Sequence, residues 1–130
     1  MKGERALAVV DAWQGAVNAA DRAALTRLSA PDIEVVGPKG AGRGAELLDD
    51  WVGRAAIQLQ PIRWFCGGGG TVVVEQLARW HDATAGLSHT VRLACSFEIK
   101  DGRVARGARH DSLERALNAS LMTMADEVSV

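Results

Sequence analysis

Glycine-rich segments are the first parts of this chain whose residue types suggest a recognisable chemistry. The segment Gly40-Ala41-Gly42-Arg43-Gly44-Ala45 approximates the GxGxxA pattern of a dinucleotide-binding loop. Such a loop follows a strand directly inside a parallel βαβ unit, and here Pro38 stands in between, so we interpret the segment as a loop that leads into a helix. The run Gly67–Gly70 lacks the Lys-Ser or Lys-Thr of a phosphate-binding loop and predicts a hairpin turn. No cofactor motif remains.

Cysteine and histidine could supply a nucleophile, a base or a metal ligand. Cys66 and Cys95 are too few for a disulfide scaffold, and together with the three histidines they show no metal-ligand spacing. We expect Cys95 to be an inert, small apolar side chain. In His81-Asp82 and His110-Asp111 the two residues are neighbours in an extended segment, so their side chains point to opposite faces and form poor dyads. We therefore predict neither a metal nor a cofactor.

Tryptophan supplies four of the six aromatic residues, and tyrosine is absent. Trp13 and Trp51 lie on the apolar stripes of two predicted helices, and Trp80 lies in phase with Gln76 on a predicted strand. A buried indole is either a core residue or a ligand contact, and its N–H requires a hydrogen-bond partner. Both interpretations stay open at this point.

Composition restricts the classes of protein that the chain can belong to. It has 130 residues, of which 48% are hydrophobic and 24% charged, and this predicts a single globular domain over residues 1–130. The formal net charge of -1 argues against a nucleic-acid partner, which needs a concentrated basic surface. Neither a membrane-spanning segment nor a signal peptide is visible, so we expect a cytoplasmic protein without a membrane partner.

Helical periodicity governs the first part of the chain. Apolar residues from Ala6 to Val17 form one stripe of a helix, with Gln14 and Asn18 on the other side. Asp21 is a predicted N-cap for a short second helix that Pro31 ends. We then predict a strand at residues 32–36, a loop at 37–44 and a third helix from Leu47 to at least Ala55.

From residue 58 the period becomes about two, which indicates strands. We predict strands at 62–66, 71–80, 91–97 and 104–110, with a longer loop over 81–88 and a type I′ turn at Asp101-Gly102. Asp111-Ser112-Leu113-Glu114 predicts a capping box at the start of a last helix, and residues after about Leu121 are expected to be loose. The fold class is α+β, with a mostly antiparallel sheet and the helices on one face.

This order of elements resembles the nuclear-transport-factor-2-like superfamily, which includes ketosteroid isomerase and the SnoaL-like polyketide cyclases. The matching features include the break Asn18-Ala19-Ala20-Asp21, the strand that ends before Pro38, and Phe97-Glu98-Ile99 ahead of Asp101-Gly102. The resemblance covers about Glu4 to Leu121. It implies a curved sheet wrapped around N-terminal helices to enclose a conical, mostly apolar pocket. It also implies a homodimer through the outer sheet face, where we expect Val73 and Leu77 beside Glu75 and Arg79.

The catalytic residues of the superfamily are not matched. The tyrosine, proton-shuttling aspartate and late-strand acid of ketosteroid isomerase correspond to Trp13, Gly37 and Cys95. Limonene-epoxide hydrolase uses an arginine and two aspartates, and the similar positions are Leu93, Cys95 and Arg109. Trp13, at the position of an oxyanion donor, could still donate one hydrogen bond to a ligand.

The resemblance and the strand phases together predict a set of ligand-binding residues: Trp13, Trp51, Gln76, Trp80, Cys95 and Arg109. Arg109 would place a permanent cation at the pocket mouth, suited to a carboxylate, enolate or phosphate. The alternative is a solvated arginine or an ion pair with Asp111. We expect Arg109 to point inward only if the last strand keeps its register across the Asp101-Gly102 turn, and a bulge would reverse this.

Two functions follow from this pattern. The first is the binding of a small apolar or aromatic molecule by a SnoaL-like protein. The alternative is a cofactor-independent isomerase, lyase or cyclase acting on a polyketide-, steroid- or terpenoid-like substrate, with Arg109 or Trp13 stabilising negative charge. The alternative needs a base, and strand phase turns Glu34 and Glu75 away from the pocket, which leaves His110 or an outlying carboxylate.

Overall fold

The computed structural model describes residues 3–37, 40–44, 46–48, 57–82 and 86–129. Within these residues a seven-stranded sheet has the order β2-β1-β6-β5-β4-β3-β7, and every neighbouring pair is antiparallel except β1 and β6. The elements are α1 (Glu4–Asn18), α2 (Arg22–Leu28), β1 (Ser29–Gly37), β2 (Gly40–Arg43), β3 (Ile57–Cys66), η1 (Gly68–Gly70), β4 (Thr71–Asp82), β5 (Leu87–Lys100), β6 (Arg103–His110), α4 (Leu113–Ala119), η2 (Met124–Asp126) and β7 (Glu127–Val128). The predicted α+β class with a curved sheet is confirmed.

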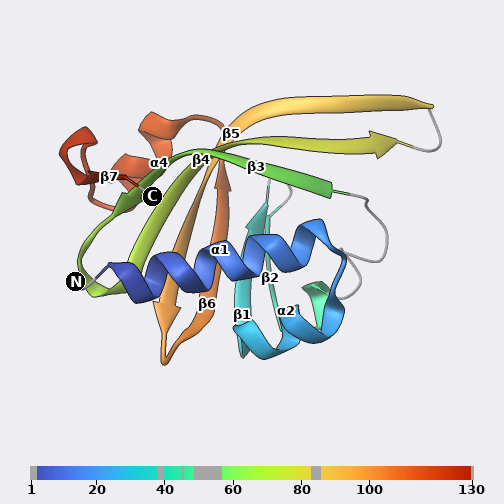
Figure 1. Ribbon diagram of the computed structural model, residues 1–130, viewed down its shortest axis with the longest axis horizontal. Helices are drawn as coiled ribbons and strands as arrows, with labels where there is room; N and C mark the ends of the chain where they lie inside the picture. The colour runs from blue at the N-terminus through green and yellow to red at the C-terminus, as the bar shows by residue number, and fades with distance from the viewer. Residues whose placement is uncertain (1–2, 38–39, 45, 49–56, 83–85, 130) are drawn as a thin grey trace.

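Helix α1 lies across the concave face of the sheet (Figure 1). Its buried stripe includes Val10, Trp13 and Val17, which join the main core with inward-facing strand residues such as Val74 and Phe97. Burial of these apolar side chains, rather than helix propensity, holds the helix against the sheet. None of the helices that the structure describes is long and apolar enough to cross a bilayer.

The connection from α1 to β1 follows the predicted break. Asp21 is the N-cap of α2, because its Oδ1 accepts a hydrogen bond of 3.1 Å from the backbone N–H of Ala24. Helix α2 ends at Leu28, and Ser29 is already extended, so Pro31 lies inside β1 and not directly after the helix. The helix therefore ends one residue earlier than the proline alone requires, since Pro31 disfavours helical geometry only at Ala30.

The predicted loop over residues 37–44 contains a strand. Residues 40–43 form β2, which pairs with β1 through Glu34 and Arg43 at one end and Gly37 and Gly40 at the other. Of the predicted third helix, the structure describes residues 46–48, which are helical, and Leu48 is buried. The rest of that helix, with Trp51, lies outside the described residues.

The long strands β4 and β5 form a hairpin that extends further than expected. His81 pairs with Ser88 and Asp82 with Leu87, so the predicted loop over 81–88 is shorter. The turn at Asp101-Gly102 is confirmed, since the two residues have φ of 54° and 74°, the positive values that a type I′ turn needs. On β5 the inward-facing Leu93 and Phe97 are buried, in keeping with the two-residue period of the predicted strand.

The outer face of the sheet is not open along its whole length, because α4 and the C-terminal segment cover part of it. Val73 is fully buried there in a second apolar cluster, so our expectation of an exposed Val73 is wrong, and the helices do not all lie on one face. The members of this cluster are Phe65, Val73, Ala94, Ala116, Leu117 and Met122. The cap of α4 is Ser112, whose Oγ accepts from the N–H of Arg115 at 3.2 Å, so the predicted capping box at Asp111 is one residue off.

The segment after Leu121 has a defined place, contrary to our expectation of a loose tail. Met122 is buried in the outer cluster, and β7 pairs with β3 through Trp64 and Val128. Glu127 accepts two hydrogen bonds from the Arg63 guanidinium, at 2.7 and 3.0 Å. This segment closes one edge of the sheet by pairings that join residues more than sixty positions apart.

Candidate ligand-binding pocket

A cavity of about 370 Å³ lies between α1 and the concave face of the sheet. Its wall is formed by residues of α1, β1, β3, β4, β5 and β6, and most of them are apolar or aromatic. The largest are Trp13, Ile57, Leu59, Trp80, Leu93 and Phe97. The walls are thus core side chains that leave a space between them.

Five of the six predicted site residues line this cavity: Trp13, Gln76, Trp80, Cys95 and Arg109. The sixth, Trp51, falls outside the described residues. Gly37 and Leu93, which correspond to catalytic positions of ketosteroid isomerase and epoxide hydrolase, also line the cavity. The strand phases of β4 and β5 therefore bring the predicted residues to one place, while the chemistry of their side chains differs from those enzymes.

Trp13 is held by a hydrogen bond inside the protein. Its Nε1–H donates to Ser29 Oγ at 3.0 Å, and its ring meets Phe97 edge to face with centroids 5.5 Å apart. Because the single N–H of an indole is already used, our suggestion that Trp13 could donate to a ligand is wrong for this geometry. Trp13 offers an aromatic surface to the cavity.

Trp80 forms another part of the wall, on the extended half of the β4–β5 hairpin. It stacks on His89 of β5, with ring centroids 5.4 Å apart and 24° between the planes. This stacking fixes the plane of a half-buried indole at the cavity wall. An aromatic surface thus stands on both the helix side and the sheet side of the cavity.

Cys95 is a neutral thiol in this environment. Burial raises its pKa to about 11, although the hydrogen bond from Gln76 Nε2 to Sγ, at 3.4 Å, and the positive charge of Arg109 act in the opposite direction. A thiol with this pKa carries almost no thiolate near neutral pH, so it is neither a nucleophile nor a ready base. The prediction of an inert side chain agrees with this pKa.

Arg109 faces the cavity because of a β-bulge, and not in spite of one. On β5, Ile99 pairs with Val104 but Glu98 pairs with Arg106, so Ala105 is an extra residue. If β6 kept the register of Ile99 and Val104 with no bulge, Cys95 would lie opposite Ala108; the bulge shifts the register by one, and Cys95 lies opposite Arg109. Our expectation that a bulge would turn Arg109 away is therefore wrong.

The Arg109 side chain is exposed at the edge of the cavity, in keeping with a place at its mouth. Within the described part of the chain it makes no ion pair, and Asp111, the partner considered from the sequence, lies 3.9 Å from Arg115 instead. A guanidinium that is not neutralised by a neighbouring carboxylate keeps its charge available for a ligand.

Gln14 lines the cavity, although we expected it on the other side of the helix. Its side chain is 2% exposed, and neither Oε1 nor Nε2 has a hydrogen-bond partner among the described residues. Helical spacing could have found it, because Gln14 follows Val10 by four residues and precedes Val17 by three. The polarity of Gln14 alone predicted a position on the exposed side of the helix.

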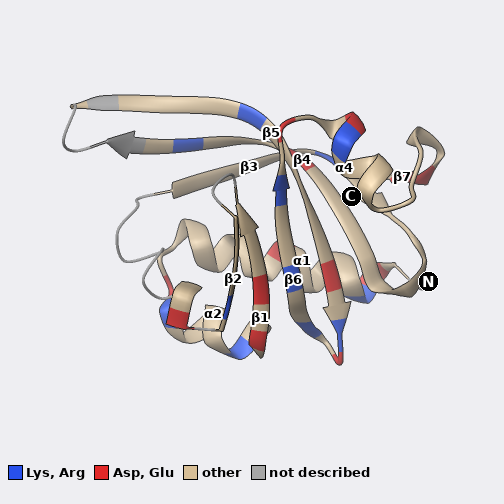
Figure 2. Cartoon of the chain, turned by 180° about the vertical axis from the view of Figure 1, so that it is seen from behind, with Lys and Arg blue, Asp and Glu red and all other residues tan. Residues whose placement is uncertain are grey.

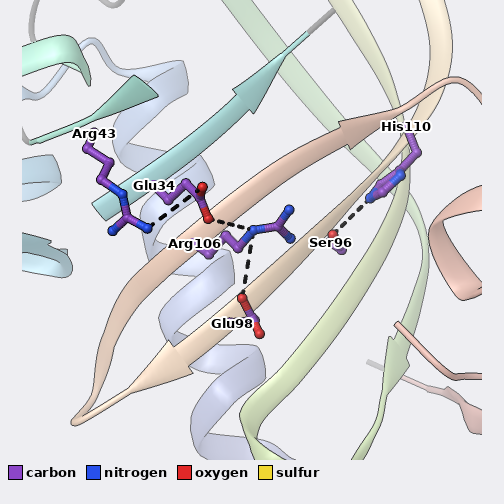
Figure 3. Close-up of polar contacts among 6 residues, drawn as sticks. All are labelled: Glu34, Arg43, Ser96, Glu98, Arg106 and His110. Atoms are coloured by element: carbon purple, nitrogen blue, oxygen red, sulfur yellow. Dashed lines mark hydrogen bonds and ion pairs between the residues drawn. The ribbon is translucent and has the colours of Figure 1, made fainter. Parts of the chain in front are cut away.

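The acidic residues considered as bases lie on the other side of the sheet, as strand phase predicted. Glu34 accepts from Arg106 Nε at 2.9 Å and lies 3.9 Å from Arg43, and Figure 3 shows these side chains together. Glu75 accepts from Arg92 Nε at 3.2 Å. In Figure 2, acidic residues on β1 and β5 lie on either side of basic residues on β6.

His110 also lies outside the cavity. Its Nε2 is 2.9 Å from Ser96 Oγ, as Figure 3 shows, and partial burial together with the charge of Arg106 lowers its pKa. None of the described residues that line the cavity is a carboxylate or a histidine. No group of metal-ligating side chains occurs among the described residues either.

The fold is the nuclear-transport-factor-2-like cone, which is also described as a ketosteroid isomerase-like fold in similar solved structures. No family model and no curated protein matches the sequence. Among solved structures, Bal32a from a soil-derived mobile gene cassette is similar with a TM-score of 0.77 and 21% identity over 85% of this chain and 91% of that one. These similarities concern the fold.

Two further structures have similar architecture. A putative polyketide cyclase from Xanthomonas campestris has a TM-score of 0.75 and 21% identity over 88% of this chain and 96% of the other. A Mycobacterium tuberculosis protein in complex with estradiol-17beta-hemisuccinate has a TM-score of 0.74 and 15% identity over 85% and 95% of the two chains. At least one protein with this fold is thus known with a steroid-derived ligand.

Proposed function

We propose that this protein binds a small apolar or aromatic molecule in the cavity between α1 and the sheet. The observation that carries the proposal is the cavity itself, about 370 Å³ in volume, with an aromatic and aliphatic wall and a single arginine at its mouth among the described lining residues. This volume falls in the lower part of the range of about 300–1,000 Å³ that is usual for small-molecule sites. It suits a ligand of two or three fused rings.

The energetics favour a ligand whose body is apolar and whose one anionic or carbonyl group lies at the mouth. Each Å² of apolar ligand surface that leaves water contributes about 25 cal/mol, so about 200 Å² would contribute roughly 5 kcal/mol before the entropy cost of binding. Arg109 can add a charge-assisted hydrogen bond to a carboxylate, enolate or carbonyl oxygen at the cavity edge. Trp13 and Trp80 supply the aromatic surfaces against which a ring system would pack.

Binding is favoured over catalysis by the chemistry of the wall. The alternative, a cofactor-independent isomerase, lyase or cyclase, needs a group that takes up a proton near neutral pH. The described lining offers Cys95, whose pKa is raised to about 11, and neither a carboxylate nor an imidazole. The fold of a putative polyketide cyclase supports the enzyme alternative only at the level of architecture.

A tryptophan-fluorescence titration tests the proposal with a matched pair of probes, 2-naphthoate and its methyl ester. Both should quench the emission, because both place a ring system against the indoles of the cavity. Arg109→Ala should weaken binding of the carboxylate by about 1.5–3 kcal/mol and change binding of the ester much less. Arg115→Ala, at an exposed arginine of α4 that is not part of the cavity wall, is the control and should change neither.

Three results separate the possibilities. If Arg109→Ala leaves both affinities unchanged while Trp13→Ala abolishes them, the pocket is purely apolar and the role of Arg109 is wrong. If neither probe binds the unaltered protein at millimolar concentration, the proposed binding function is wrong. If the protein transforms a substrate-like ketone while Cys95→Ala retains that activity, a base outside the described wall is present and the enzyme alternative replaces this one.

We also propose a cytoplasmic homodimer that forms across the part of the outer sheet face that α4 leaves open. Leu77 and Arg79 lie on this part, and Leu77 is partly exposed. Val73 no longer contributes, since it is fully buried under the C-terminal segment. Sedimentation velocity at micromolar concentration should show a dimer that Leu77→Asp dissociates. A monomeric unaltered protein would contradict this assembly.

A further inference from the structure

The two glutamines of the cavity wall have hydrogen-bonding atoms that the protein leaves unused. Gln14 on α1 and Gln76 on β4 are 2% and 1% exposed. Among the described residues, Gln14 has no partner for either Oε1 or Nε2, and Gln76 has none for Oε1. Only the Gln76 amide nitrogen is used, in a 3.4 Å hydrogen bond to the thiol of Cys95, which is a weak acceptor.

Among the described residues, one other buried side chain has an unpaired oxygen, Glu75 Oε1 on the outer face of the sheet, and its Oε2 accepts from Arg92 Nε at 3.2 Å. Other buried polar groups are paired. Trp13 Nε1 and Ser29 Oγ satisfy each other at 3.0 Å, and Ser96 Oγ lies 2.9 Å from His110 Nε2. Buried polar groups in native proteins are nearly always hydrogen-bonded, so an unpaired buried group calls for a specific cause such as a water or a ligand. Two such groups on the wall of one cavity point to a shared partner inside that cavity.

The free atoms define the chemistry of that partner. Oε1 and Nε2 of Gln14 form one edge of a primary amide, which presents an acceptor and a donor side by side. The complementary edge is a cis amide, whose N–H and C=O also lie side by side. Gln76 Oε1 adds a second acceptor, which favours a ligand with an N–H. A carboxylate is a poor match at this depth, because it would bring its oxygens against two carbonyl oxygens and offer them no proton.

We propose that Gln14 and Gln76 select an aromatic or alicyclic ligand with a cis-amide edge, such as a lactam, an imide or a primary carboxamide. The proposal rests on the proposed function, since it specifies the ligand class of the same cavity. It assigns the buried end of the ligand to the amide edge and leaves Arg109, which is exposed, at the mouth. Selectivity then comes from the buried amides and not from the charge.

Isothermal titration calorimetry with probes of similar size tests the proposal. The probes are isoquinolin-1(2H)-one, which has the lactam edge, its N-methyl derivative, which lacks the donor, and 2-methoxynaphthalene, which keeps the rings and an acceptor. We expect the lactam to bind at least tenfold more tightly than the other two. A fourth probe, 2-naphthol, offers one hydroxyl in place of the amide edge and should bind more weakly than the lactam.

Gln14→Met removes the amide with little change in side-chain length. In this variant the lactam should lose its tenfold advantage, while 2-methoxynaphthalene should bind as well as it does to the unaltered protein. Gln76→Met should reduce the advantage in part. Gln60→Met is the matched control, because Gln60 is exposed on β3 and absent from the cavity wall, and it should change no affinity.

The outcomes separate this proposal from the proposed function. If all four probes bind with equal affinity, the cavity binds apolar rings and the amide selectivity is wrong. If 2-naphthol equals the lactam, a lone hydroxyl suffices and the cis-amide assignment is wrong. If Gln14→Met leaves the lactam's advantage intact, Gln14 does not recognise it. If no probe binds, the proposed function and the ligand class assigned to it are both wrong.

Discussion

Replacing Gln14 by methionine should stabilise the protein in the absence of any ligand. The amide of Gln14 is buried without a hydrogen-bond partner among the described residues, so the folded state loses the contacts with water that this group makes in the unfolded chain. Methionine has a similar length, a similar helix propensity and no group that needs a hydrogen bond. The substitution therefore removes a cost and introduces little strain.

The size of the effect follows from the number of unpaired groups. Leaving a buried polar group unsatisfied costs about 1–3 kcal/mol, and Oε1 and Nε2 of Gln14 belong to one amide, which we count as one group. We expect the free energy of unfolding to rise by about 1–3 kcal/mol. For a chain of 130 residues, 1 kcal/mol corresponds to roughly 4 °C in the midpoint of thermal unfolding, so the midpoint should rise by roughly 4–12 °C.

Urea denaturation followed by circular dichroism, together with calorimetry, measures this change. Gln60→Met is again the control, and because Gln60 is exposed, its effect should stay within about 0.5 kcal/mol. If Gln14→Met instead lowers the stability by 1 kcal/mol or more, the amide has partners in the free protein, such as ordered water in the cavity. In that case its unpaired state would no longer argue for a ligand. If Gln14→Met is more stable than the unaltered protein and binds the lactam probe more weakly, the amide of Gln14 lowers the stability of the fold and contributes to ligand recognition.

Three further results are expected. Ser29→Ala removes the acceptor of the Trp13 indole N–H and should lower the free energy of unfolding by about 1–3 kcal/mol; an unchanged value would show that the indole finds another partner. The pKa of Cys95 is raised to about 11, so its alkylation in a Cys66→Ala variant should be roughly 100-fold slower at pH 8 than that of a thiol with the ordinary pKa of 9.0. The reaction should accelerate as the pH approaches 11, and rapid reaction at pH 8 would contradict the buried thiol. Truncation after Leu121 should lower the midpoint of thermal unfolding by at least 5 °C and increase the binding of a hydrophobic dye, since it uncovers the outer apolar cluster; an unchanged midpoint would mean that the segment is dispensable.

The sequence predicted most of what depends on local periodicity. The stripe of α1, the N-cap at Asp21 and the turn at Asp101-Gly102 were all visible, because each depends on residues within a few positions of one another. The alternation from Leu93 to Phe97 also predicted the inward face of β5, and with it the position of Cys95 on the cavity wall. These local rules were sufficient to bring most of the candidate site together.

What the sequence did not predict depends on long-range contacts or on irregularities. The pairing of β7 with β3 joins Trp64 to Val128, and nothing in the last residues alone signals it. Ala94 shows a related difficulty: alternation placed it on an outer face, but only the tertiary structure shows that α4 covers that face. Gln14 was misassigned for a third reason, because polarity outweighed position on the helix.

Because Ala105 forms a bulge, the number of residues in β6 after the bulge determines which side chain lies opposite Cys95 at the cavity wall. The bulge shifts the residues that follow it by one position in their pairing with β5, and this shifted register begins at Arg106 opposite Glu98. Loss of Ala105 itself would leave a regular ladder with Arg109 still opposite Cys95. Loss of one residue further along, at Ala108, would instead bring His110 opposite Cys95 and exchange a permanent cation for a titratable imidazole. A single deletion, without any change of side chain, is thus a short route from a binding cavity to one that holds a base.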